Sequence, residues 1–125
     1  MKKILALIIL SVSGLSFADG NNDWQKIDEN IIKLNSLNSC QGCLLRDVIF
    51  VGADFNIAVL SGADFISSDL SNSNFYNADL EGSSFFGAEM NGSNLENANL
   101  FGSNLFAVNL LLINFIVFIM IYNLS

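Results

Sequence analysis

Two cysteines provide the one spacing in this chain that is typical of redox chemistry. Gln41 and Gly42 separate Cys40 from Cys43 and allow the tight turn that a Cys-x-x-Cys disulfide needs. Catalytic thiol exchange is one hypothesis, but no thioredoxin-like strand–helix–strand pattern surrounds the pair. Leu44 stands where a haem-attachment motif has histidine, and two thiolates alone make an incomplete zinc site. We therefore expect a structural role for the two cysteines, as a disulfide or as buried thiols.

The remaining composition offers little to a catalyst. The 125 residues include no histidine, which excludes His-based acid–base catalysis and metal or haem sites that use imidazole. No phosphate-binding loop, dinucleotide fingerprint or Gly-x-Ser-x-Gly motif is present. The 12 acidic and 5 basic residues give a net charge of −7, which repels phosphate backbones. We expect no enzyme activity, no cofactor, no metal site and no direct nucleic-acid binding.

A repeat of five residues runs through the sequence from residue 45. An α-helix would spread residues five apart around its circumference, and a straight strand would send them to alternate faces. The chain must therefore turn once in each pentapeptide, so that every large side chain points into one core. The position two residues before each large one is Ala or Ser from Ala53 to Ser103 and shares its inward direction. The predicted core ladder is Leu45, Phe50, Phe55, Leu60, Phe65, Leu70, Phe75, Leu80, Phe85, Met90, Leu95, Leu100, Leu105 and Leu110, and the register continues at Phe115.

The other positions of the repeat also fit a chain that turns every five residues. The position between the small and the large residue is mostly Asp, Asn or Glu, as an outward position requires. The position two residues after each large one is rich in Gly and Asn, which tolerate the dihedral angles of tight turns. The predicted corners are Gly52, Gly62, Asn72, Asn77, Gly82, Gly87, Gly92, Asn97 and Gly102.

These residues resemble the pentapeptide-repeat family, whose signature is Ala-Asp/Asn-Leu-x-x. The signature appears as Ala-Asp-Leu-Glu-Gly at residues 78–82 and as Ala-Asn-Leu-Phe-Gly at residues 98–102. The resemblance implies an all-β solenoid, a right-handed quadrilateral β-helix in which four pentapeptides make one coil of 20 residues. The Cys-x-x-Cys lead-in is similar to exported members of the family, where it precedes the first coil. Bulky Val48 and Ile113 replace the expected small residue near the two ends.

A 20-residue coil places residues 20 apart above one another, so each outer face can be analysed as a column. One column combines Arg46 with three large apolar residues, and a fourth apolar residue lies beside it across a corner. Soluble proteins seldom leave such patches uncovered, so the column is a candidate interface; the alternative is ladder packing that strengthens the wall. The next columns are acidic and keep the rod soluble. The candidate interface residues are Ile66, Phe86, Phe101 and Phe106.

The segment before the repeat is predicted to contain a signal peptide and a capping helix. Lys2 and Lys3, a short apolar run and a small-residue site give residues 1–18 the pattern of a secretory signal peptide cut after Ala18. The alternative is an uncleaved anchor, but the run is much shorter than the roughly 20 residues that span a bilayer. Residues 19–39 are polar, with apolar residues spaced by three and four as in an amphipathic helix. That helix face is Trp24, Ile27, Ile31 and Leu34, with Asn22 or Asp23 as N-cap.

The repeat domain is predicted at residues 40–115, followed by a hydrophobic tail at 116–125. Residues 105–122 are apolar apart from Asn109 and Asn114 and contribute, with the leader, to the mean hydropathy of +0.50. The tail has three interpretations: a membrane anchor, a plug that closes the coil or joins two copies, or the product of a truncated or frame-shifted gene. The persisting repeat register and the lack of a following Lys or Arg favour the plug.

The sequence predicts a non-catalytic, exported scaffold or protein-interaction module that is periplasmic or secreted. Its partner would be a protein, or a second copy bound through the C-terminal end or the apolar face. Removal of the leader leaves 3 basic and 12 acidic residues, a charge of −9. That charge suits an alternative that the resemblance implies, an acidic DNA mimic that binds a type II topoisomerase. A third alternative is a membrane-anchored surface repeat protein, held by the tail.

Overall fold

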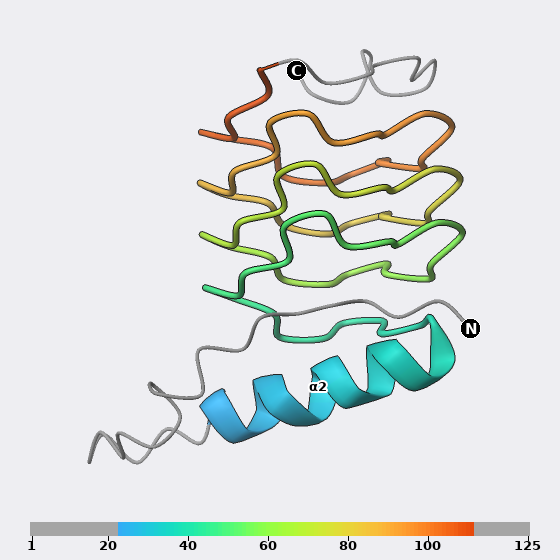
Figure 1. The fold of residues 1–125 in the computed structure, drawn as a ribbon, viewed down its shortest axis with the longest axis vertical. Coiled ribbons are helices and arrows are strands. Elements are labelled where there is room, and N and C mark those ends of the chain that lie inside the picture. Colours follow the sequence, from blue (N-terminus) through green and yellow to red (C-terminus); the bar gives the residue numbers. More distant parts are fainter. Residues whose placement is uncertain (1–22, 112–125) are drawn as a thin grey trace.

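The computed structural model describes residues 23–111, which form one helix and a square coil of stacked turns (Figure 1). Helix α2, Asp23–Leu37, lies across the first coil and runs along the end of the stack. The predicted signal peptide, the N-cap at Asn22, Phe115 and the tail at 116–125 lie outside the described residues. Within residues 23–111, no helix has the length and hydropathy needed to cross a bilayer.

Parallel β-bridges between residues 20 apart define the coil. They run from Ser39↔Val59 to Glu89↔Asn109, one in every pentapeptide. Each bridge is one residue long in the described part of the chain, because the backbone turns on both sides of it. Backbone hydrogen bonds join successive coils in both directions: Leu80 N donates to Asn99 O at 2.7 Å, and Asp79 N donates to Ala58 O at 2.9 Å. Four pentapeptides therefore make one coil, as the resemblance to the family implies.

Every fifth residue from Gly42 to Ala107 forms a corner with a positive φ. The nine predicted Gly and Asn corners all adopt this left-handed conformation. Four further corners adopt it with residues that the sequence does not favour there, because the hydrogen bonds to the neighbouring coils fix the turn whatever side chain occupies it. These four are Asp47, Ile57, Ser67 and Ala107.

Ile57 is the most strained of these corners. It is β-branched at a φ of 55°, and its side chain is 57% exposed, so little burial compensates. Asn77 and Asn97 occupy the equivalent corner in the next two coils. We expect Ile57→Asn to raise the unfolding free energy by about 1 kcal/mol, measured by urea denaturation. The reverse change Asn77→Ile should lower it by a similar amount, and a lower stability for Ile57→Asn would contradict the strain.

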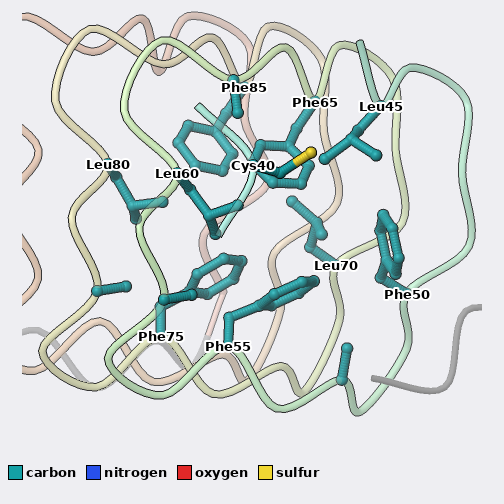
Figure 2. Close-up of a cluster of buried hydrophobic side chains, with 14 of the residues drawn as sticks. Cys40, Leu45, Phe50, Phe55, Leu60, Phe65, Leu70, Phe75, Leu80 and Phe85 are labelled. Atoms are coloured by element: carbon teal, nitrogen blue, oxygen red, sulfur yellow. The ribbon is translucent and has the colours of Figure 1, made fainter. Parts of the chain in front are cut away.

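The core is a column of large side chains along the coil axis. The predicted ladder residues from Leu45 to Leu100 are buried, and Figure 2 shows those from Leu45 to Phe85 meeting in the interior. Aromatic rings 20 residues apart stack along the rod, with centroids 4.7 Å apart for Phe55 and Phe75. Burial is incomplete at the last two predicted ladder positions: Leu105 is half-buried and packs against the core, and Leu110 is 36% exposed. Among the described residues these two have a coil on one side only, so fewer neighbours cover them.

Serine replaces alanine at five of the small inward positions without leaving a buried hydroxyl unpaired. The Oγ atom of Ser83 donates to its own turn at Leu80 O, 2.6 Å away. The Oγ atom of Ser68 instead links two coils, because it donates to Leu45 O at 2.6 Å and accepts from Val48 N at 3.1 Å. Each serine therefore completes the backbone hydrogen bonding while keeping the small volume that the position requires.

Helix α2 covers the open end of the first coil. Ile27, Ile31 and Leu34 are buried as predicted, and Trp24 is half-buried against the core. Asn30 is buried among them, and its Nδ2 atom donates to Leu44 O at 3.0 Å, which fixes the helix to the coil. Asn38 ends the helix with a φ of 50° and donates its backbone N–H to Leu34 O at 2.9 Å. The helix thus shields apolar side chains that a bare coil end would expose.

Candidate functional site

The two cysteines form a buried disulfide at the start of the coil. Cys40 and Cys43 have Cα atoms 5.4 Å apart across the corner at Gly42. Cys40 is fully buried beneath α2, with its Sγ atom 3.4 Å from the carbonyl oxygen of Asn30, and Cys43 is 5% exposed. Cys40 occupies the core column of Leu60, one repeat earlier than the predicted ladder begins. Thiol exchange needs an accessible sulfur, so this burial favours a structural role.

We expect the disulfide to resist reduction while the protein is folded. A thiol reductant cannot reach the sulfur atoms unless α2 and the first coil open. Mild dithiothreitol followed by iodoacetamide should add no label to the native protein and two labels in urea, as counted by mass spectrometry. Rapid labelling of the native protein would show that the sulfur atoms are accessible and would revive a redox role.

The acidic and amide side chains of the outward positions mainly shape the turns. Asp54 Oδ1 accepts a hydrogen bond from Asn56 N at 3.0 Å, and the same contact recurs around the coil. Neighbouring coils add side-chain ladders: Asn74 Nδ2 donates to Asp54 Oδ1 at 3.2 Å, and Asn94 Nδ2 donates to Asn74 Oδ1 at 3.3 Å. Within residues 23–111, no group of three His, Cys, Asp or Glu side chains has metal-binding geometry. These oxygens therefore fix the backbone.

The coil has four outer faces, and their charges differ. Face I is residues 44–46, 64–66, 84–86 and 104–106; face II is 49–51, 69–71, 89–91 and 109–111; face III is 54–56, 74–76 and 94–96; face IV is 59–61, 79–81 and 99–101. Faces II, III and IV each carry two carboxylates and no basic residue: Asp69 and Glu89, Asp54 and Glu96, and Asp79 and Glu81. On face I the one carboxylate, Asp64, forms an ion pair with Arg46. Face I is therefore neutral, while the other three are acidic.

Face I also carries the most extended apolar column. Phe86 and Phe106 stack with ring centroids 5.7 Å apart, and their side chains are 43% and 71% exposed. Ile66 lies one coil below Phe86 and is half-buried. The predicted column therefore forms an apolar stripe on the one wall of the described coil that has no net charge.

The candidate interface residues separate into two groups. Ile66, Phe86 and Phe106 share face I, whereas Phe101 lies on face IV, one coil above Glu81, and is 51% exposed. Among the described residues, no ring contact joins Phe101 to the Phe86–Phe106 pair. The sequence analysis missed the Arg46–Asp64 ion pair, although the residues stand 18 apart, close to one coil. Counting charges over each whole face would have found that face I carries one positive and one negative residue, although the contact between them needs the structure.

Comparison with known proteins supports the repeat assignment. The family model described as pentapeptide repeats matches in eight copies, over residues 39–77, 65–102 and 78–110. The matched region contains the predicted repeats from Leu45 to Leu110, so the resemblance seen in the sequence is confirmed. No curated protein gives a significant match to the chain.

Three solved structures illustrate what the chain is similar to. Rfr23, a pentapeptide repeat protein from the cyanobacterium Cyanothece 51142, is 20% identical over 70% of this chain and 93% of its own, with a TM-score of 0.31. The pentapeptide repeat protein alr5209 from Nostoc Pcc 7120 is 23% identical over 69% and 74%, with a TM-score of 0.38. QnrB1, a plasmid-mediated fluoroquinolone resistance protein, is 16% identical over 57% and 47%, with a TM-score of 0.23. Such distant similarity carries no function over to this chain.

Proposed function

We propose, because the chain belongs to the pentapeptide-repeat family, that it is an exported, non-catalytic module that binds another protein through face I. The family fold is a right-handed quadrilateral β-helix, whose walls display side chains outward. The observation that carries the proposal is the exposed stack of Phe86 on Phe106 upon a face with no net charge. Solvent-exposed aromatic pairs of this kind are typical of interaction sites.

Two features support export. The first 18 residues have the pattern of a secretory signal peptide, and the disulfide between Cys40 and Cys43 is a bond that persists in oxidising compartments. Cell fractionation with N-terminal sequencing tests this part of the proposal. We expect a mature protein that begins at Asp19 in the periplasm or the medium, and a cytoplasmic protein that retains residues 1–18 would overturn it.

Site-directed photo-crosslinking tests the binding role. A photoreactive benzoylphenylalanine in place of Phe86 should yield a defined adduct with one other protein in the cells of origin. The matched control replaces Tyr76, an aromatic residue on the opposite face III, and should yield none. Equal adducts from both positions, or none from position 86, would contradict the proposal. An adduct of twice the chain's mass would show that face I binds a second copy of this chain and not a different protein.

The alternative functions expected from the sequence, a DNA mimic that binds a type II topoisomerase and a membrane-anchored surface protein, stay predictions.

A further inference from the structure

We infer that the partner of face I is an amphipathic segment with one apolar stripe flanked on both sides by Lys or Arg. This inference rests on the proposed function and names the chemistry of the protein that face I would bind. Carboxylates flank the apolar column, and these flanking charges determine which partner fits it.

Face I lies between two acidic faces. Around each coil, face I is followed by face II and preceded by face IV, because the chain turns once per pentapeptide. Face II contributes Asp69 and Glu89, and face IV contributes Asp79 and Glu81. Asp47 adds a further carboxylate at the corner between faces I and II. At the coil of Phe86 the cross-section of the surface is therefore acidic, apolar and acidic, with Glu81 on one side and Glu89 on the other, whereas the positions beside Phe106 are asparagine or apolar.

The centre of this surface holds no unpaired charge. Arg46 is the one basic residue of the coil in residues 39–111, and its guanidinium is engaged by Asp64. A partner that covers Phe86 and Phe106 would bring its own flanks towards the carboxylates of faces II and IV. Acidic flanks would be repelled there, and basic flanks would be attracted. The charge pattern thus selects both an apolar stripe and its basic borders.

The same pattern disfavours two other occupants. A second copy of this chain would present its own acidic faces II and IV beside face I, which places like charges together. An anionic lipid surface would meet the same repulsion. A basic amphipathic segment is the occupant that satisfies the aromatic stripe and the carboxylates together.

The size of face I limits the length of the segment and its affinity. The column from residue 46 to residue 106 crosses three coil spacings, about 14 Å, which matches roughly nine residues of an α-helix. A contact of this length is smaller than a standard stable interface. We therefore expect a weak, salt-sensitive complex.

Designed peptides test the inference directly. The probe is a 14-residue helical peptide of Leu and Lys whose Leu residues form one stripe, and the matched probe has Glu in place of every Lys. The full chain should bind the Lys peptide about tenfold or more tightly than the Glu peptide in fluorescence anisotropy, and the affinity should fall with added salt. Equal binding of both peptides would overturn the basic-flank inference while leaving an apolar binding face. Binding of neither would overturn the inference too, and the crosslinking experiment would still decide the proposed function.

Charge-matched variants show whether the peptide binds at face I. The double variant Glu81→Gln with Glu89→Gln removes one carboxylate from each flank and should lower the affinity for the Lys peptide about fivefold. Removing two carboxylates from the opposite face, in Asp54→Asn with Glu96→Gln, should leave the affinity unchanged, because the asparagine amide keeps the oxygen that the turn uses. Phe106→Ser should abolish detectable binding. An equal loss in both charge variants would show general attraction to an acidic protein and would overturn the inference.

Discussion

Replacing Leu80 by aspartate is expected to abolish folding of the coil. Leu80 is fully buried at the middle of the stack, with Leu60 and Leu100 below and above it in the same column. A carboxyl group at this position would have no polar partner among these apolar side chains, and burying it costs several kcal/mol. The whole free energy of unfolding of a small domain is of order 5–15 kcal/mol. Because each coil is held by its neighbours, a break at the centre leaves two fragments without a complete core.

Two control variants test whether the loss of folding comes from burying a carboxylate and not from adding a carboxylate or from changing residue 80. Phe86→Asp adds the same carboxylate to the outer wall and should keep the circular dichroism spectrum of the native coil. Leu80→Met keeps the buried volume and should cost less than about 1.5 kcal/mol in urea denaturation. A Leu80→Asp protein with a native spectrum and an unchanged urea midpoint would show that position 80 does not lie in the core.

The five-residue period made most of the fold predictable from the sequence. A side-chain pattern that fits neither a helix nor a strand leaves a chain that turns at fixed intervals, and the described coil turns in this way from Gly42 to Ala107. The direction of each position followed from its place in the repeat, so Phe65 and Leu80 were assigned to the core and Asp79 to the surface. The local pattern and the global fold agree at nearly every pentapeptide.

The features that the sequence did not predict depend on contacts between coils or between the helix and the coil. Ile57 forms a corner although its own preference opposes the conformation, because the surrounding hydrogen bonds impose it. Asn30 is polar and lies among apolar helix positions, so its burial becomes clear only when Leu44 O is placed as its acceptor. Cys40 lies within the predicted repeat domain but not on the predicted core ladder, which begins at Leu45, whereas the first bridge is at Ser39. In the first two cases a tertiary contact overrides a local preference, and in the third the coil begins one repeat earlier than the predicted ladder.

The sequence predicted the residues of the candidate interface but not the contacts between their charges, because those contacts join different coils. Columns of residues 20 apart correctly brought Phe86 and Phe106 together, since stacking follows from the coil length alone. The corner between faces IV and I separates Phe101 from them. The zero net charge of face I follows from its residue types, but the ion pair between Arg46 and Asp64 joins residues of different coils and different columns. A sequence pattern gives the positions on each wall but leaves the pairing of charges to the structure.

Replacing Leu34 by alanine is expected to detach the capping helix from the first coil. Leu34 is fully buried at the centre of the apolar face of α2, and truncating such a side chain costs about 2–5 kcal/mol. Ile32 is the matched control, since it lies on the same helix but is 65% exposed. Ile32→Ala should change the unfolding free energy by no more than about 0.5 kcal/mol. Urea denaturation of the two variants measures the difference.

Hydrogen exchange shows how far the loss of the cap spreads along the rod. Cys40 and Gly42 lie in the coil that α2 covers, and their amides donate to Val59 O and Ser61 O of the next coil. Leu80 lies two coils further along the rod, and its amide donates to Asn99 O. If α2 is a cap on a solenoid, Leu34→Ala should accelerate exchange at Cys40 and Gly42 much more than at Leu80, because each coil depends on its nearest neighbours. Equal acceleration at all three amides would instead show that helix and coil open as one unit. In that case the buried disulfide would become reducible only when the whole rod unfolds.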